Sequence, residues 1–153
     1  MRDPVTGFEY PPTWVERCTV PADLRLAEQG LGILTSSGTV LRRGFTTGTT
    51  AAAACKAAIL SLSCNPIPSV SLRLACGLTV EVPVTADDGK ASCAKYAGDY
   101  PADVTAGLII VAEAIPISCG IQIQPEEGIG RFTRNTHRYR DRKSVEYGNR
   151  VDN

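Results

Sequence analysis

Beyond residue 40, the apolar residues follow first a helical and then an alternating pattern. Leu41–Leu62 is rich in alanine, the strongest helix former, and predicts a helix that ends at Ser63 or Asn65, because the residue before a proline avoids the helical region. Thr47 or Thr49 can cap this helix by accepting a hydrogen bond from a free amide of the first turn, and Gly48 can take a positive φ beside it. A second, short helix is expected over residues 22–31.

After the helix, the pattern changes to the alternation that is typical of half-buried strands. Residues 69–75 and 78–84 alternate on either side of Cys76–Gly77 and predict a β-hairpin, and residues 85–90 predict a turn around Asp88–Gly89. Further strands are expected at 91–96, 108–115 and 117–123. This order predicts an α+β fold, a two-layer domain with a helix on a mixed β-sheet.

The two ends of the chain lack a periodic apolar face. Residues 1–20 contain several prolines and predict an extended, poorly ordered lead-in, so we place the domain at residues 21–130. Residues 131–153 carry seven basic against three acidic residues and predict a poorly ordered basic tail. Such a tail is more often solvated than bound to an anionic partner.

Composition excludes some classes of function. The formal net charge is zero, so nothing global indicates nucleic acid or a membrane surface as a partner. We find neither an apolar run long enough to span a bilayer nor a secretory leader, and expect a cytoplasmic protein. The six cysteines include no C-x-x-C pair and His137 is the only histidine, so no protein-bound metal is expected. Most cysteines lie in apolar segments and are expected to be reduced core residues: Cys55, Cys76, Cys93 and Cys119.

The start of the alanine-rich helix is a candidate anion site. Free amides and the helix dipole at a helix N-terminus favour negative charge, and here threonine hydroxyls surround that end with two arginines just upstream. The segment lacks the spacing of a Walker loop, so a nucleotidase is not indicated. A purely structural cap remains the alternative. The residues in question are Arg43, Thr46, Thr47, Gly48 and Thr49.

Two further segments contain candidate polar residues. The loop KYAGDYPADVTAG, residues 95–107, places Asp99 and Asp103 where they could coordinate a metal, act in proton transfer, or hold hydroxyls and amines. The alternative is a solvated loop with turn-forming aspartates. The segment EEGIG, residues 126–130, has glycines that permit a ligand to approach the backbone closely, although the pattern alone is weak.

These three segments together resemble the CbiD family, the cobalt-precorrin-5B C(1)-methyltransferases of anaerobic cobalamin biosynthesis. LRRGFTTGTTAAAACKAA is similar to the family's N-terminal signature, KYAGDYPADVTAG to its K-x-A-G-D-D-P-D-V-T-x-G block, and EEGIGRFTR to its E-G-x-G-x-x-T-[RK] block. Their order and separations match from about Leu41 to Arg134. Two departures lie in the second block, where Tyr100 replaces an aspartate and Ala102 is an additional residue before Asp103.

The resemblance implies methyl transfer from S-adenosylmethionine to C-1 of a cobalt-corrinoid substrate. It also implies a first domain that resembles the second domain of a small-subunit ribosomal protein, and the family's second α/β domain is expected to be missing here. Residues that the resemblance assigns to substrate binding are Arg43, Thr46, Thr47, Gly48, Thr49, Lys95, Gly98, Asp99, Asp103 and Thr105. Those assigned to the methyl donor are Glu127, Gly128 and Gly130; the catalytic residues stay open.

Three functional hypotheses remain. The first is the methyltransferase itself. The second is a non-catalytic corrinoid-binding module that needs a separately encoded C-terminal half. The third and weakest is nucleic-acid binding, which rests on fold analogy and the basic tail and is therefore poorly supported.

Overall fold

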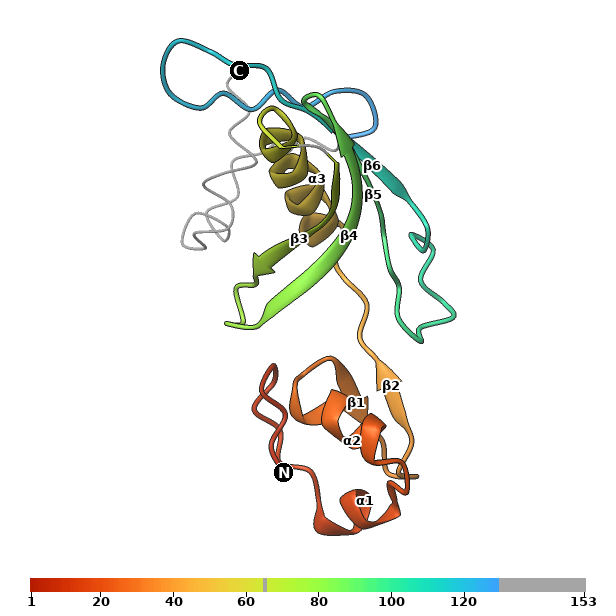
Figure 1. Ribbon diagram of the computed structural model, residues 1–153. Coiled ribbons are helices and arrows are strands. Elements are labelled where there is room, and N and C mark those ends of the chain that lie inside the picture. The colour runs from red at the N-terminus through yellow and green to blue at the C-terminus, as the bar shows by residue number, and fades with distance from the viewer. Residues whose placement is uncertain (65, 130–153) are drawn as a thin grey trace, which may run out of the picture. The chain divides into compact units, whose positions relative to one another are not determined.

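The computed structural model describes residues 1–64 and 66–129. Residues 1–115 form one compact unit, and a second unit begins at Pro116. Figure 1 labels the helices and strands of the first unit. The first unit consists of an N-terminal part, residues 1–42, and a helix-on-sheet part, residues 45–115. Its elements are α1 (Pro12–Arg17), α2 (Pro21–Glu28), β1 (Gly32–Leu34), β2 (Val40–Arg42), α3 (Thr47–Ser61), β3 (Ile67–Arg73), β4 (Thr79–Asp87), β5 (Lys90–Ala94) and β6 (Ile109–Glu113).

The helix-on-sheet part contains four strands in the order β3-β4-β5-β6. Every strand pair is antiparallel, which corrects the expectation of a mixed sheet: sequential strands joined by hairpins and loops need no crossover helix. The predicted hairpin is confirmed, with Val70 opposite Val82. β4 continues to Asp87, further than expected, and turns at Asp88 and Gly89, whose φ values of 42° and 78° suit a two-residue hairpin turn.

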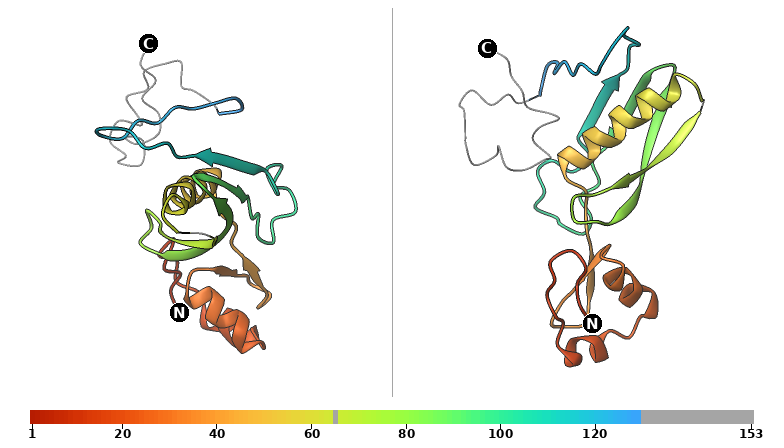
Figure 2. Two further views of the ribbon diagram at one scale, coloured as in Figure 1. Left: turned by 45° about the horizontal axis from the view of Figure 1, so that its top comes forward. Right: turned by 90° about the vertical axis from the view of Figure 1, so that its left-hand side faces the viewer.

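Helix α3 covers one face of this sheet, as the end-on view in Figure 2 shows. Its buried side is made of small residues, and Ala53, Ala54, Ala57 and Ala58 are each at most 1% exposed. They pack on the inward residues of the strands, Val80, Val82, Val84, Ala86, Ala91 and Cys93. Because alanine has only one side-chain carbon, the helix backbone can lie close to the sheet.

The ends of α3 differ from the prediction. The N-cap is Thr46, whose hydroxyl accepts a 3.0 Å hydrogen bond from the Thr49 amide, so the cap lies one residue before the predicted Thr47. Gly48 lies inside the first turn and is not among the residues with positive φ. The helix ends at Ser61, earlier than expected, and Asn65 lies outside the described residues. Thr46, Thr47 and Thr49 are all suitable N-cap residues, so the local sequence does not decide which of them caps the helix.

The N-terminal part is a small fold of α1, α2 and the β1–β2 hairpin. Tyr10, Ala27, Leu34 and Val40 form its buried core, and Trp14 packs against them. The expectation of an extended lead-in over residues 1–20 is therefore wrong, because this segment folds as part of the N-terminal part. Residues 1–10 fold back on themselves through a bridge between Arg2 and Glu9, and α1 follows. The boundaries 21–130 and 131–153 stay predictions.

Two other expectations are corrected. Within the described residues 116–129 there is no strand, although 117–123 was expected to form one; several of its apolar side chains are exposed. All six cysteines lie in the described residues and are free thiols, but Cys55, Cys76 and Cys119 are exposed and only Cys93 of the expected four is buried. Over residues 1–64 and 66–129, no helix has the length and apolar character needed to span a membrane.

Candidate functional site

A cleft of about 440 Å³ opens in the first unit at the start of α3. The N-terminal part, the segment that leads into α3, the β3–β4 turn and Tyr100 all contribute to it. Most of its wall is apolar, with a few polar residues among those that line it. Its lining is Val5, Gly30, Leu31, Ile33, Arg43, Gly44, Phe45, Thr46, Thr49, Leu74, Ala75, Cys76, Leu78, Val80 and Tyr100.

The first two sequence motifs meet beside this cleft. The Arg42 amide donates to a carboxylate oxygen of Asp99 at 2.8 Å, and the Asp99 amide donates back to the Arg42 carbonyl at 3.1 Å. The Phe45 amide donates to the Tyr96 carbonyl at 2.8 Å. Gly98 allows this approach: its φ is +65°, and a Cβ there would lie 2.2 Å from the Arg42 carbonyl oxygen. Asp99 and Gly98 therefore join the two segments and are not themselves in the lining.

The N-terminus of α3 forms the polar side of the cleft. Thr46 and Thr49 both line it, and their hydroxyl oxygens lie 3.0 Å apart. The Thr49 amide is capped and the Thr50 amide bonds to the Thr46 carbonyl. No partner in the described chain accepts from the amides of Thr47 and Gly48. Unpaired amides at the positive end of a 15-residue helix can bind an anionic oxygen.

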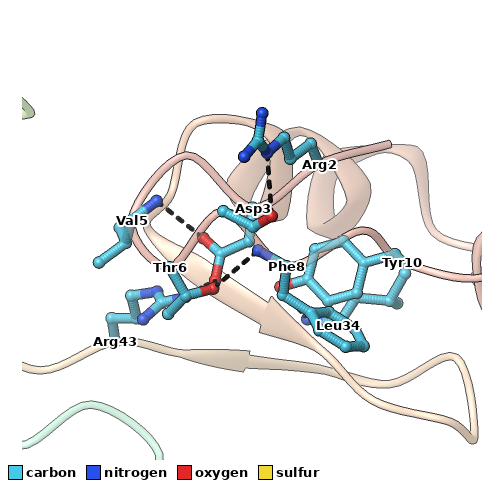
Figure 3. A network of polar contacts seen from close by, with 9 residues as sticks. Arg2, Asp3, Val5, Thr6, Phe8, Tyr10, Leu34 and Arg43 are labelled. Carbon is cyan, nitrogen blue, oxygen red and sulfur yellow. Dashed lines mark hydrogen bonds and ion pairs between the residues drawn. The ribbon is translucent and has the colours of Figure 1, made fainter.

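Arg43 is the cation of the cleft. Its Nη2 donates to the Asp3 carboxylate at 2.5 Å, and its Nε is buried without a partner. Figure 3 shows Asp3 among Val5, Thr6 and Arg43. Burial by itself would raise the pKa of Asp3, but hydrogen bonds from Thr6 and Val5 and the Arg43 charge outweigh that effect and hold this pKa below its ordinary value.

The remaining candidate residues of the second motif, Lys95, Asp103 and Thr105, interact with one another within their loop. The buried Lys95 ammonium pairs with Asp103, and Asp103 also accepts from the amide and hydroxyl of Thr105 at 2.9 and 2.5 Å. The Lys95 hydrogen bond and the two from Thr105 lower the pKa of Asp103 to about 2. None of these three residues lines the cleft, so the structure gives them a local structural role. A ligand-binding role for them stays a prediction.

The other predicted residues are divided between two places. Thr47 and Gly48 are exposed on the first turn of α3, outside the lining. Glu127 and Gly128 belong to the second unit, in a turn closed by a bond from the Ile129 amide to the Glu126 carbonyl. Gly130 lies outside the described residues.

Sequence analysis missed two features of the cleft. Asp3 lies in a segment without apolar periodicity, and no local signal indicates that it reaches Arg43, 40 residues away. The apolar wall was also missed, because Leu31, Ile33 and Leu78 look like ordinary core positions in the sequence. Tyr100 also lines the cleft, but the sequence analysis noted it only because it departs from a family motif.

Comparison with known proteins identifies the family. The model of the CbiD family matches residues 30–141, which is most of the chain. The chain belongs to the CbiD family. It is 58% identical over 143 residues to a cobalt-precorrin-5B C(1)-methyltransferase from Methanoregula boonei, covering 94% of this chain and 42% of that relative. It is 59% identical over 141 residues to a protein of the same name from Methanoculleus marisnigri, covering 92% of this chain and 42% of that relative.

A solved structure agrees with this membership. The crystal structure of the cobalamin biosynthesis protein CbiD from Archaeoglobus fulgidus matches with a TM-score of 0.63 and 42% sequence identity. The match covers 74% of this chain and 38% of that one. The α+β fold of this chain is thus a CbiD fold, and the chain spans about 42% of the length of the curated relatives named above. The likeness to a ribosomal protein domain stays a prediction.

Proposed function

We propose that this chain takes part in the S-adenosylmethionine-dependent methylation of cobalt-precorrin-5B at C-1, which gives cobalt-precorrin-6A in anaerobic cobalamin biosynthesis. One observation carries the proposal: relatives 58% and 59% identical over more than nine-tenths of the chain are named for this reaction. The cleft supports it, because Arg43, Thr46 and Thr49 come from the family's first motif and lie together there. We place the reaction in the cytoplasm.

This methyl transfer requires no covalent intermediate on the protein. The sulfonium of the donor is already activated, so C-1 of the corrinoid supplies an electron pair to the methyl carbon and the sulfur leaves as the neutral thioether. The protein must hold the two reactants in line and keep water out. Neither task requires a general acid or a metal ion from this chain.

The cleft is suited to a flat, largely apolar ring with carboxylates on its rim. Leu31, Phe45 and Leu78 offer an apolar wall on which a ring face can rest. Arg43 and the hydroxyls of Thr46 and Thr49 are directional donors for the rim carboxylates. We retain Glu127, Gly128 and Gly130 as candidates for the donor site, on the resemblance of their motif alone.

The decisive experiment is an assay of the purified chain with methyl-labelled S-adenosylmethionine and cobalt-precorrin-5B, with mass spectrometry of the product. The proposal expects a product that is heavier by one methyl group. Thr49→Val should weaken corrinoid binding by about tenfold, the loss of roughly one good hydrogen bond to a charged group. Thr47→Val is the matched control, because Thr47 lies on the same helical turn but outside the cleft. Equal affinities of the two variants would remove the α3 terminus from the site.

The alternative is that this chain binds the corrinoid without methylating it and acts with a partner polypeptide for turnover; the names of the relatives favour the enzyme. The same assay separates the two functions. Turnover by the chain alone supports the enzyme. Binding without turnover, followed by turnover when a polypeptide covering the rest of the Methanoregula boonei relative is added, supports the binding module.

A further inference from the structure

A carboxylate from the first residues of the chain lies against the arginine of the cleft. Asp3 is 2% exposed, and its Oδ2 is 2.5 Å from Nη2 of Arg43 (Figure 3). The same oxygen accepts from the Thr6 hydroxyl at 2.6 Å, while Oδ1 accepts from the Val5 amide at 3.0 Å. Both oxygens are thus held by neighbours in their own turn before they meet the guanidinium.

The turn that presents Asp3 is itself fixed. The Asp3 amide donates to the Phe8 carbonyl at 2.8 Å, and the Gly7 amide donates to the Asp3 carbonyl at 2.8 Å. Behind it, Tyr10 is buried and its hydroxyl accepts from the Leu34 amide. The carboxylate therefore cannot follow Arg43 if the arginine moves, and it acts as a fixed anchor for one end of the guanidinium.

Asp3 pairs with Nη2 of the Arg43 guanidinium, so the other N–H groups of Arg43 remain as hydrogen-bond donors. A guanidinium has five N–H groups in a rigid plane, so fixing one edge sets the direction of the others. The Nε–H has no partner although it is buried, and a buried donor without a partner needs an explanation. Arg43 contributes to the lining of the cleft and, together with Asp3, to that of a smaller hollow of about 170 Å³.

We propose that Asp3 is a positioning residue for the binding of a substrate carboxylate by Arg43. This rests on the proposed function, because it assumes that the cleft takes the carboxylates of a corrinoid. Asp3 cancels the charge of Arg43, so the pair gives the cleft no net positive field. The arginine then contributes orientation: its remaining donors point in one direction before the ligand arrives, which reduces the entropy lost on binding.

Charge and orientation predict opposite results for the nearly isosteric variant Asp3→Asn. If Asp3 only neutralised Arg43, its removal would leave a free cation and tighten the binding of an anion. If Asp3 positions Arg43, its removal releases the guanidinium, and binding weakens. We expect the second result, with affinity about tenfold lower, which corresponds to about 1.4 kcal/mol.

The experiment is a titration of the full chain with cobyrinic acid, a cobalt corrinoid with free carboxylate side chains, followed by its absorbance. Wild type, Asp3→Asn, Arg43→Gln and the double variant form a cycle in which Asp3→Asn should have no further effect once Arg43 is replaced. The fully esterified corrinoid should bind wild type and Asp3→Asn alike. Glu9→Gln is the matched control, since it removes an exposed acid from the same segment, and it should bind as wild type does.

The outcomes are distinguishable. No binding of cobyrinic acid by the wild-type chain would overturn the proposed substrate and the role of Asp3 together. Binding by wild type with equal or tighter binding by Asp3→Asn would overturn the role of Asp3 alone. If Asp3→Asn does not fold, Thr6→Val gives the same test, because it removes one hydrogen bond to Asp3 and leaves the ion pair. An intermediate loss of affinity is expected for it, and unchanged affinity counts against the proposal.

Discussion

The helix-on-sheet part and the N-terminal part build their cores from side chains of different size. In the first, four alanines of α3 lie on valines and alanines of the sheet, so the elements approach closely over a large surface. In the second, a few large side chains, Tyr10, Trp14 and Leu34, fill the space between short elements. The cleft lies where residues of both parts meet, and its polar groups come from both.

This difference shows how the site is assembled. The helix-on-sheet part supplies a rigid helix N-terminus, whose position is set by extensive backbone packing. The N-terminal part supplies Val5, Leu31 and Ile33 of the apolar wall, and the carboxylate that holds Arg43. Between them, residues 42–45 are tied to the loop after β5 by backbone hydrogen bonds. The difference between the two parts predicts effects on stability that decrease from this junction to the helix core and then to the loop after β5.

The largest effect is expected at the junction, for Gly98→Ala. A Cβ at residue 98 would meet the Arg42 carbonyl oxygen at 2.2 Å and the Gly44 amide nitrogen at 2.6 Å, and φ is +65°. Left-handed strain and forced separation of two backbones together predict a loss of about 3 kcal/mol in the free energy of unfolding. Urea denaturation followed by circular dichroism measures this loss.

Gly107→Ala is the control for that substitution. Gly107 lies in the same loop with φ of +74°, but nothing approaches its Cβ position within 4 Å. Only backbone strain applies there, so a loss of about 1 kcal/mol is expected. Similar losses for the two variants would mean that the close approach of the two motifs does not stabilise the fold.

A smaller effect is expected in the helix core, for Ala57→Val. Ala57 is fully buried against the sheet, and two added methyl groups must push α3 outward or take a strained rotamer. Overpacking of this kind costs about 2 kcal/mol. Ala52→Val is the matched control, because residue 52 is exposed on the same helix and loses only helix propensity, about 0.5 kcal/mol. Thermal unfolding of both variants measures the difference, and equal melting temperatures would contradict the close-packed picture.

The same contrast explains what the sequence could predict. α3 and strands β3, β4, β5 and β6 were predicted in type and order, because their apolar residues repeat with the period of the element. Sequence pattern does not encode strand direction, which is why an antiparallel sheet was expected to be mixed. The N-terminal part has short elements and no periodic face, so α1 and the turn around Asp3 were missed.

The candidate site was predictable only in part. Arg43, Thr46 and Thr49 were candidates from the sequence, and they line the cleft. The start of a helix has a local sequence signal, although here it pointed to Thr47 or Thr49 and not to the actual cap, Thr46. Asp103 and Lys95 were candidates in the loop, but they pair with each other and do not line the cleft. A pairing between residues eight positions apart is not visible in composition. Asp3 could not be found, because its partner is set by the fold and not by spacing.

The smallest effect is expected in the loop, from the pH dependence of Asp103. Its pKa is about 2 in the folded chain and about 3.9 in an unfolded one. A carboxyl whose pKa is depressed on folding contributes stability that is present above the unfolded value and is lost as pH falls through the folded value. The urea midpoint of the wild-type chain should therefore fall between about pH 4 and about pH 2. Asp103→Asn should lower the midpoint at neutral pH and remove part of this slope, whereas Asp87→Asn, at an exposed position of β4, should leave the slope as it is. If Asp103→Asn and wild type lose stability in parallel over this range, the Lys95–Asp103 pair does not stabilise the loop after β5.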